Sequence, residues 1–430
     1  MPYDRLPQAA KRIAVIGGGI SGMGAAHALA ADHLVTLIEA EPRLGGHART
    51  VLAGKRDDQP VDTGFIVFNH ATYPNLRALF DELDVPTAKA QMTFATSVDG
   101  GRFEYALNSL DSVFGQRRNI ADPRFWGFLR DIARFNSQAE ALVEGEEMTI
   151  AGLLGKLGTG AWFRDYYILP FSGAIWSTPT HGILEFPAAA LVRFFRNHAL
   201  LSATGQHQWY TVRGGSVEYV RRLHASMTAR GVDIRTGTRV TGVTRTAFGV
   251  QVATEGQGWE DFDEVVLATH SDISLKLLQD ADPQEQAALS AIRYQPNTAV
   301  LHSDARLMPR RKRCWAAWNY TEAAGARPDR ISLSYWMNAL QPIPKHDPLF
   351  VTLNPVREIR DETIHDTTTF HHPVYDVGAL AAQQVLKARN GQNRTWFCGA
   401  WMRNGFHEDG LASALDVVAG LQTPLQIAAE

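Results

Sequence analysis

The chain has 430 residues, of which 45% are hydrophobic and 20% charged, and its formal net charge is -3. This is the composition of a globular protein with enough core for two or three domains, and its charge balance gives no reason to expect a nucleic acid as partner. Its two cysteines are too few for a disulfide framework or a zinc site. The sequence also contains no run of about 20 apolar residues, which is the length needed to span a bilayer. We therefore expect a cytoplasmic protein without a metal.

The first distinct pattern near the N-terminus is typical of a dinucleotide site. An apolar run over 13–16 predicts a buried strand, and three glycines in G-x-G-x-x-G spacing follow it. A small-residue helix is expected over 20–31, and a second apolar strand over 34–38 ends on Glu39. Such glycines permit a tight turn, close approach of a pyrophosphate and close packing of the helix, while the acid can bind a ribose hydroxyl. The expected site residues are Gly17, Gly19, Ile20, Ser21, Gly22, Glu39 and Ala40.

The rest of the chain alternates between sheet-like and helical stretches. A helix is expected over 73–83, and two strands over 91–107 around a turn with two glycines. From about 110 to 201 strand patterns give way to amphipathic helices with many aromatic residues. Strand patterns return over 209–269, and 291–384 is also rich in them. The C-terminal segment is expected to form a strand, a glycine-containing loop and a closing helix.

Three further segments resemble the flavin amine oxidase and phytoene desaturase superfamily. They are R-L-G-G-H-A-R-T over 43–50, D-T-G-F over 62–65 and D-G-L-A-S-A over 409–414. The resemblance implies non-covalent FAD and an α/β fold, in which a Rossmann-like FAD-binding domain of amine oxidase type carries an inserted α+β substrate domain. On this basis the FAD-binding domain comprises 1–95, 206–290 and 385–430, with a helical substrate segment over 96–205 and a β-rich one over 291–384.

The same resemblance implies further cofactor-binding residues. His47 departs from the superfamily pattern, which has an arginine at this position. The helix that begins near Asp409 would stabilise negative charge on the reduced flavin. Cys398 lies in a strand-like run and is interpreted as a buried apolar residue rather than a flavin attachment. The implied residues are Arg43, Gly45, Gly46, His47, Arg49, Thr63, Gly64, Phe65, Ile66, Val240, Ala268, Gly399, Asp409, Gly410 and Leu411.

No second G-x-G-x-x-G follows a strand, so the flavin is expected to be reduced by the organic substrate rather than by NADPH. Segments such as A-I-W-S-T-P over 174–179 and H-H-P-V-Y-D over 371–376 are similar to one bacterial flavoprotein family, often encoded beside cyclopropane-type fatty-acid synthases. That family includes the methylated fatty-acyl desaturases of furan fatty acid biosynthesis. The resemblance implies desaturation of a methyl-branched acyl chain, carried on a phospholipid, by hydride transfer to flavin N5.

Two other functions remain open at this stage. One is another flavin oxidase, of amine or carotenoid/porphyrinogen type, and the other is a non-redox FAD-dependent isomerase or a flavin-binding module. Family amine oxidases commonly place a lysine near flavin N5, but the corresponding stretch 291–308 contains none and has Asn297 near that position. This difference counts against an amine oxidase.

The catalytic residues are not determined by the sequence. His371, His372, Tyr335 and Trp336 are candidates, because the resemblance places them in the substrate region. Histidine is the usual proton acceptor near neutral pH, so the wider set of candidate bases also contains His70, His181, His198 and His270. Aromatic residues of the helical stretch could line an acyl tunnel, although most are expected to fill the core: Phe125, Trp126, Phe128, Trp162, Phe163, Phe171, Trp176, Phe194 and Phe195. Four aromatic residues of the β-rich substrate region are better candidates for the wall facing the flavin: Trp315, Trp318, Tyr335 and Trp336.

A basic run stands at 310–313 and another basic pair at Arg117 and Arg118. Such residues could contact the phosphates of lipid headgroups. We therefore expect peripheral contact with the inner face of the membrane, in keeping with a methylated fatty acyl phospholipid as substrate.

Overall fold

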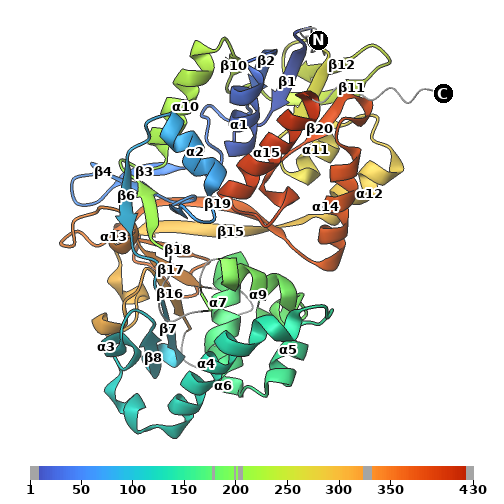
Figure 1. Cartoon of the computed structure of the whole chain (residues 1–430). Helices are drawn as coiled ribbons and strands as arrows, with labels where there is room; N and C mark the ends of the chain where they lie inside the picture. Colours follow the sequence, from blue (N-terminus) through green and yellow to red (C-terminus); the bar gives the residue numbers. More distant parts are fainter. Residues whose placement is uncertain (1–8, 177–179, 198–199, 202–206, 323–331, 423–430) are drawn as a thin grey trace, which may run out of the picture.

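A computed structural model describes residues 9–176, 180–197, 200–201, 207–322 and 332–422 (Figure 1). The chain forms two units, drawn one above the other in Figure 1. The upper unit contains a parallel sheet with helices, and the lower unit contains a mixed sheet covered on one side by helices. Two long strands, β15 (Arg293–His302) and β19 (Ile364–Val374), run across the boundary between the units.

The core of the upper unit is a five-stranded parallel sheet. Its central strand, Arg12–Ile16, has a parallel neighbour on each side. Ile13, Val15, Leu37 and Val266 of these three strands are fully buried. The buried β-branched and leucine residues explain why these short apolar runs form strands inside a doubly covered sheet. In spatial order the strands are β10 (Asp233–Arg235), β2 (Leu34–Ile38), β1 (Arg12–Ile16), β14 (Glu264–Leu267) and β20 (Thr395–Phe397).

Helices and a small antiparallel sheet cover this parallel sheet. Helix α1 (Ile20–Leu29) lies beside the C-terminal helix α15 (His407–Gln422), although almost the whole chain separates them in sequence (Figure 1). The other helices here are α2 (Pro74–Glu82), α10 (Val217–Ala229), α11 (Ser271–Leu277), α12 (Pro283–Ala291) and α14 (Val377–Arg389). The small sheet has the order β11 (Val240–Arg245), β12 (Val250–Thr254), β13 (Trp259–Phe262).

The lower unit is built on a seven-stranded sheet that β15 and β19 extend toward the upper unit. Only the β16–β7 pair is parallel among the pairs of this sheet in the described residues. The other strands, in spatial order after β19 and β15, are β18 (Phe350–Leu353), β17 (Leu333–Trp336), β16 (Trp318–Thr321), β7 (Phe94–Val98) and β8 (Phe103–Ala106).

A helical segment packs on the β7–β16–β17 end of this sheet. Its core is aromatic, and Phe125, Phe128, Phe135, Phe163 and Phe195 are at most 1% exposed. This burial confirms that most aromatic residues of the segment fill the core. The helices are α3 (Leu110–Val113), α4 (Pro123–Val143), α5 (Ile150–Leu157), α6 (Ala161–Phe163), a π-helical turn (Arg164–Ile168), α7 (Leu169–Trp176), α8 (Thr180–Ile183) and α9 (Ala188–Asn197).

Two small sheets and a short helix lie near the junction of the units. The carboxylate of Asp62, at the end of β4, is fully buried and binds groups from both sides of this junction. One sheet pairs β3 (Thr50–Ala53) with β4 (Gln59–Asp62), and the other has the order β5 (Val67–Asn69), β9 (Trp209–Val212), β6 (Thr87–Ala90), with α13 (Met337–Leu340) nearby.

Most of the expected elements are present, and the predicted fold class is confirmed. The strand over 13–16, the helix from Ile20 and the strand over 34–38 lie as predicted. The long strand β19 was not predicted, because the run I-H-D-T-T-T-F-H-H over 364–372 is mostly polar. The division of the chain into these five predicted domain segments stays a prediction.

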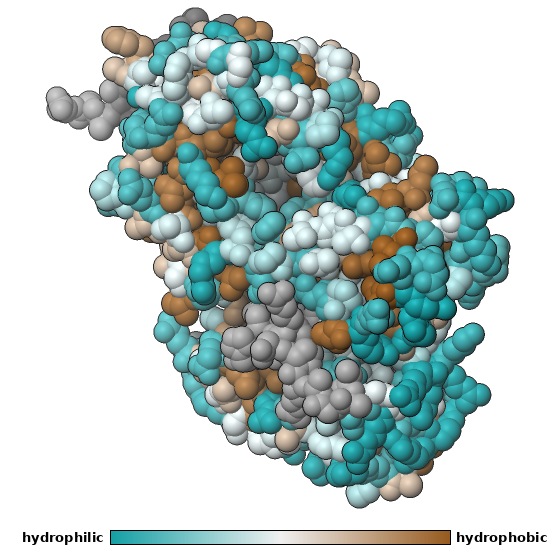
Figure 2. Space-filling view, turned by 180° about the vertical axis from the view of Figure 1, so that it is seen from behind, coloured by the Kyte–Doolittle hydropathy of each residue, from teal (hydrophilic) through white to brown (hydrophobic). Residues whose placement is uncertain are grey.

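The described helices include none that is both long and apolar enough to cross a membrane. Seen from behind, hydrophobic residues reach the surface in scattered patches rather than in one continuous band (Figure 2).

Candidate active site

The glycine loop after β1 is packed against the backbone of its neighbours. The Gly17 N–H donates to the Ile38 carbonyl at 2.8 Å, and Gly17 has a φ of +108°. A Cβ on Gly17 would lie 2.9 Å from the Ala268 carbonyl oxygen, and one on Gly22 would lie 1.8 Å from the Gly17 carbonyl oxygen. Both positions therefore require glycine for the folding of the loop itself.

Gly19 borders open space instead. A Cβ built on it has no atom within 4 Å. Gly19 is the N-cap of α1, no side chain caps this helix, and its first turn carries no acidic residue. The first N–H groups of α1 therefore present the partial positive charge of a helix N-terminus to this space. A pyrophosphate fits this position, and Ile20 and Ser21 begin the helix behind it.

The carboxylate of Glu39 holds the loop from the end of β2. Glu39 Oε2 accepts the Gly18 N–H at 2.5 Å, and Oε1 accepts the Glu41 N–H at 2.7 Å. Each oxygen of an ionised carboxylate can accept more than one hydrogen bond. A ribose contact is therefore compatible with these bonds, and it stays a prediction for Glu39 and its exposed neighbour Ala40.

The second glycine loop, over 43–49, lies directly against the first. The Gly45 N–H donates to the Gly18 carbonyl at 2.8 Å, and a Cβ on Gly46 would lie 3.2 Å from the Gly19 Cα. The Arg43 guanidinium donates to the Gly46 carbonyl at 3.0 Å. Arg43 thus stabilises the loop in which it lies, and the sequence motif corresponds to a real junction of two loops.

Arg49 connects this second loop to the lower unit. Its guanidinium makes two bonds with the Asp366 carboxylate on β19, at 2.6 and 3.0 Å. The backbone continues the connection, because the Thr63 N–H donates to the Arg49 carbonyl at 2.9 Å. The guanidinium is thus already engaged by a carboxylate, and a contact of Arg49 with a cofactor stays a prediction.

The segment 63–66 passes close to the second loop. A Cβ on Gly64 would lie 2.0 Å from the His47 carbonyl oxygen, which accepts the Phe65 N–H at 2.9 Å. The Phe65 ring stacks on the His407 ring at 3.9 Å, and the Tyr219 hydroxyl bonds His407 Nε2 at 2.6 Å. Burial lowers the pKa of His407 to about 3. This arrangement joins the predicted Thr63–Ile66 segment to the first residue of α15.

The start of α15 reaches the glycine loop of α1. A Cβ on Gly410 would lie 2.9 Å from Ser21 Oγ, and a Cβ on Gly24 would lie 2.5 Å from Leu411 Cδ1. The Gly399 N–H donates to Ser413 Oγ at 2.9 Å, which fixes the loop before the helix. The N-termini of α1 and α15 therefore converge. Val240 lies elsewhere, buried at the start of β11.

A cluster of rings lies beside the second loop, and we call His47, His270, His372, Phe370 and Tyr294 the histidine cluster. Phe370 is buried and the other four side chains are half-buried. The His47 ring lies 4.9 Å from Phe370, 5.7 Å from His372 and 6.0 Å from His270. His270 stacks on Tyr294 at 4.3 Å. Burial lowers the pKa of each of the three histidines, and the pKa of His372 falls to about 4. Neighbouring histidines lower these pKa values further, and for His270 this neighbour is His371. The three imidazoles are neutral at pH 7.

A chain of amide groups determines which nitrogen of His372 carries the proton. The Thr298 N–H donates to Asn354 Oδ1 at 3.0 Å, so Asn354 Nδ2 is the donor to Asn297 Oδ1 at 2.8 Å. Asn297 Nδ2 must then donate to His372 Nδ1, at 3.1 Å. Because Nδ1 accepts, neutral His372 carries its proton on Nε2. His372 is therefore arranged as a hydrogen-bond donor rather than a base at Nε2.

The pairing of the strands separates the four catalytic candidates. His372, Phe370 and Asp366 alternate along β19 and share one face of the sheet, whereas His371 points to the other face and is exposed. Tyr335 pairs with Trp318 across the strands, at 5.2 Å between ring centroids, on the side of the core that contains Phe370.

Trp336 lies on the opposite face of β17, beside Trp315 at 5.4 Å. His372 and Tyr335 therefore share the face of the histidine cluster, while His371 and Trp336 do not, because consecutive residues of a strand point in opposite directions. Trp315 precedes the strand of Trp318, and its ring lies against Trp336 and Phe350 on that opposite face. Of the four aromatic candidates for the wall facing the flavin, Trp318 and Tyr335 therefore lie on the face of the histidine cluster.

The other candidate bases are not brought together. His70 is exposed and stacks on Tyr210 at 4.2 Å. His198 and the side chains of His181 and Trp176 lie outside the described residues. Trp126, a candidate for the tunnel, is instead 50% exposed at the surface. Of the four candidate histidines whose side chains the structure describes, His270 and His372 belong to the cluster, together with His47, which the glycine motif indicated.

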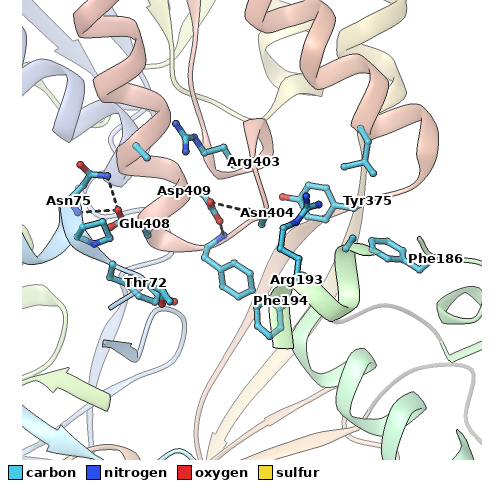
Figure 3. A pocket seen from close by; sticks show the side chains of 16 residues that line it. Thr72, Asn75, Phe186, Arg193, Phe194, Tyr375, Arg403, Asn404, Glu408 and Asp409 are labelled. Carbon is cyan, nitrogen blue, oxygen red and sulfur yellow. Dashed lines mark hydrogen bonds between the residues drawn. The ribbon is translucent and has the colours of Figure 1, made fainter. Parts of the chain in front are cut away.

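A cavity of about 330 Å³ lies where the helical segment meets the start of α15 (Figure 3). Arg193 and Phe194 of α9 point into it from the lower unit, and Asp409 faces it from α15. Burial raises the pKa of Asp409. Glu408, on the same side of α15, accepts the backbone N–H groups of Asn75 and Leu76 at 3.0 and 2.9 Å. The face of α15 that lines the cavity is therefore not the face on which Gly410 packs against α1.

Cys398 is fully buried, and burial raises the pKa of its thiol to about 12. It therefore lacks the thiolate character that covalent chemistry requires. Within the described part of the chain, no group of three or more histidine, cysteine or acidic residues could hold a metal ion.

Comparisons with known proteins agree with this geometry. A sequence model described as flavin containing amine oxidoreductase matches residues 20–309. A comparison with curated proteins found no match.

Solved structures with the same fold include a CLA-producing fatty acid isomerase from P. acnes, at 17% identity and a TM-score of 0.68 over 97% of this chain and 100% of that chain. Putrescine oxidase bound to putrescine is similar at 14% identity and a TM-score of 0.66, over 95% of this chain and 99% of that chain. Cyclohexylamine oxidase from Brevibacterium oxydans IH-35A is similar at 14% identity and 0.65, over 96% and 100%.

Proposed function

The chain belongs to the flavin containing amine oxidoreductase family, and from this premise we propose that it desaturates an uncharged, methyl-branched fatty acyl chain carried on a phospholipid. FAD is its cofactor, and the class of reaction is an oxidation–reduction. FAD, when bound, accepts a hydride from the substrate. The more specific part of the proposal, the acyl substrate, depends on the chemistry of the residues around the cofactor.

The residues present fit FAD at both ends of the chain. The open N-terminus of α1 at Gly19 would hold the pyrophosphate, and Glu39 would bind the ribose. The start of α15, which packs on α1 at Gly410, would stabilise negative charge on the reduced ring. The fit rests on the open space beside Gly19, which a side chain at that position would fill.

The observation that carries the substrate proposal is that the histidine cluster is neutral. Its imidazoles have lowered pKa values, and its other members are the rings of Phe370 and Tyr294. Where family amine oxidases commonly have a lysine, Asn297 holds the Nδ1 atom of His372. The cluster contributes no carboxylate that would bind a protonated amine. Such surroundings favour an apolar chain over a charged one.

The same face of the sheet continues away from the cluster as apolar surface. Phe370 belongs to a core against which Trp318 and Tyr335 pack, and these two rings also contact the aromatic core of the helical segment. An acyl chain placed along this face would be kept away from water between the two units. The Nε2–H group of His372 would then orient a polar atom near the reacting carbons.

The test is anaerobic mixing of the purified holoprotein with four compounds while the absorbance of oxidised flavin is followed. The compounds are a phospholipid with a methyl-branched, monounsaturated acyl chain, the same lipid without the methyl branch, putrescine and cyclohexylamine. We expect the branched lipid to bleach the flavin and to lose two hydrogens by mass, and both amines to leave the flavin oxidised. The His372→Gln variant should keep its FAD and bleach more slowly.

Two results would overturn the proposal. Bleaching by an amine and not by either lipid would identify an amine oxidase. A shift of the double bond in the lipid without net loss of hydrogen would identify an isomerase. The similar protein from P. acnes is a fatty acid isomerase.

A further inference from the structure

Three large apolar side chains are exposed together at the lower end of the molecule. Leu110 is 80% exposed, and Ile120 and Trp126 are each 50% exposed. Ile120 and Trp126 lie close to each other, because the Trp126 indole N–H donates to the Ile120 carbonyl at 2.9 Å. Leu110 is linked to them through Phe114, whose N–H donates to the Leu110 carbonyl at 3.1 Å and whose ring packs on the Trp126 ring at 5.4 Å. Neighbouring apolar side chains exposed in this way indicate an interaction surface.

Cations surround these apolar side chains. Arg118 lies on the 3₁₀ turn η2 (Arg117–Ala121) beside Ile120. The turn η5 (Lys312–Cys314) reaches the same place, since a Cβ on Gly115 would lie 3.6 Å from the Arg313 Cβ. Within the described residues, no carboxylate forms an ion pair with Arg118, Lys312 or Arg313, so their charges are not neutralised there. The Arg118 guanidinium donates to the Arg102 carbonyl, and the Lys312 ammonium lies 5.9 Å from the centre of the Trp315 ring.

The acidic residues of this region are already paired. Asp111 forms an ion pair with Arg117, and Asp122 forms one with Arg124 at 2.7 Å. Glu104 is fully buried and binds Arg311. The unpaired charge that reaches solvent around the apolar side chains is therefore positive, which complements an anionic surface.

We propose that this surface docks the protein on an anionic phospholipid bilayer. We call it the basic tip, and it consists of Leu110, Ile120, Trp126, Arg118, Lys312 and Arg313. Tryptophan is favoured at the level of lipid headgroups, where its ring is buried and its N–H stays polar. Leucine and isoleucine enter the acyl boundary, and arginine and lysine bind the phosphates. Stable peripheral binding requires these two contributions together.

The apolar side chains distinguish a bilayer from a nucleic acid. Binding of a nucleic acid uses cations and stacked aromatic rings. It would leave Leu110, the most exposed of the three apolar side chains of the basic tip, in water. The proposal goes beyond the proposed reaction and does not depend on it, because a failure of lipid to bleach the flavin would leave vesicle binding unchanged.

The test is flotation of the full-length holoprotein with vesicles of two compositions. One contains equal parts of phosphatidylglycerol and phosphatidylcholine, and the other contains phosphatidylcholine alone. We expect the protein to float with the anionic vesicles and much less with the neutral ones. Removal of two cations in Lys312→Gln/Arg313→Gln should weaken binding about 25-fold, at about fivefold for each charge.

Two further variants separate docking from a general loss of solubility or folding. Leu110→Ser/Ile120→Ser should weaken binding to anionic vesicles, whereas Phe248→Ser should not. Phe248 is the matched control, since it is 92% exposed but lies in the β11–β12 hairpin of the upper unit. All variants are required to keep the FAD absorbance and melting temperature of the wild type.

The proposal is overturned if the wild type does not float with anionic vesicles. It is also overturned if the tip variants float like the wild type, or if Phe248→Ser loses binding to the same extent. Retention of the wild type by a single-stranded oligonucleotide without vesicle binding would identify a nucleic-acid surface instead.

Discussion

A Cβ built on Gly19 meets no atom within 4 Å, whereas one on Gly22 would lie 1.8 Å from the Gly17 carbonyl oxygen. The backbone at Gly19 is also extended, with φ of -76°, so other residues can adopt it. Two glycines of one motif therefore have different roles: Gly22 is required for folding, and Gly19 leaves space for a ligand.

We predict that Gly19→Val folds normally but is purified without the yellow colour of FAD, because the side chain would occupy the space for the pyrophosphate. Absorbance of the purified protein and its melting temperature measured without added FAD check both statements. Gly155→Val is the matched control, since Gly155 lies on α5 with no atom within 4 Å of a Cβ. Full FAD occupancy in Gly19→Val would refute our placement of the pyrophosphate.

The second prediction at this scale concerns His372 and pH. Burial lowers the pKa of this imidazole from 6.5 to about 4 in the folded protein, so the unfolded chain binds more protons between these values. The stability contributed by neutral His372 is complete above pH 6.5 and is lost as pH falls from 6.5 to 4. Between pH 7 and pH 5 the loss is about 2 kcal/mol.

We therefore expect the free energy of unfolding of His372→Gln to fall by about 2 kcal/mol less than that of the wild type between pH 7 and pH 5. Glutamine keeps an amide for the bond to Asn297 but cannot take up a proton. Urea unfolding at the two pH values is the measurement, and His224→Gln, at an exposed position on α10, is the control. An identical pH response in His372→Gln and the wild type would contradict the prediction.

At the scale of the elements, the contact between α1 and α15 joins the two ends of the chain. A side chain at Gly24 would displace the buried Leu411 side chain, because its Cβ would lie 2.5 Å from Leu411 Cδ1. We predict that Gly24→Val destabilises the protein by about 1–3 kcal/mol through overpacking. Combining it with Leu411→Ala should restore part of this loss, since the two side chains occupy the same space. Thermal unfolding of the single and double variants measures the coupling, and strictly additive losses would exclude the contact.

The elements that could be predicted from the sequence are those whose signals are local. β1, the glycine loop, α1, β2 and Glu39 follow one another within 13–39, and each has its own residue pattern. β19 could not be predicted, because its polar residues form a strand only through pairing with β15. The bond from Asn297 to His372 depends on the same pairing across 75 residues. The difference between the faces of His371 and His372 likewise follows from the register of this strand.

At the scale of the whole molecule, Asp62 joins three segments that lie far apart in the sequence. Its fully buried carboxylate accepts bonds from Thr50 Oγ1 at 2.6 Å, the Ser216 N–H at 2.8 Å and Gln341 Nε2 at 3.0 Å. These donors belong to β3, the start of α10 and the residue after α13, so one side chain connects the upper unit to the lower one. The sequence motif D-T-G-F indicated a cofactor segment here. It did not indicate that its aspartate, Asp62, connects the two units, because this depends on contacts between segments that are distant in the sequence.

We predict that Asp62→Ala lowers the free energy of unfolding by about 3 kcal/mol, because it leaves the buried donors of Thr50, Ser216 and Gln341 without an acceptor. Urea unfolding at pH 7 measures this loss, and Asp58→Ala is the control, since Asp58 forms only an exposed ion pair with Arg56. The two units should also separate more readily, so limited proteolysis between β4 and β5 should become faster in Asp62→Ala alone. If both variants unfolded like the wild type, the junction would be stabilised by other contacts, of which the bonds between Arg49 and Asp366 are the nearest alternative.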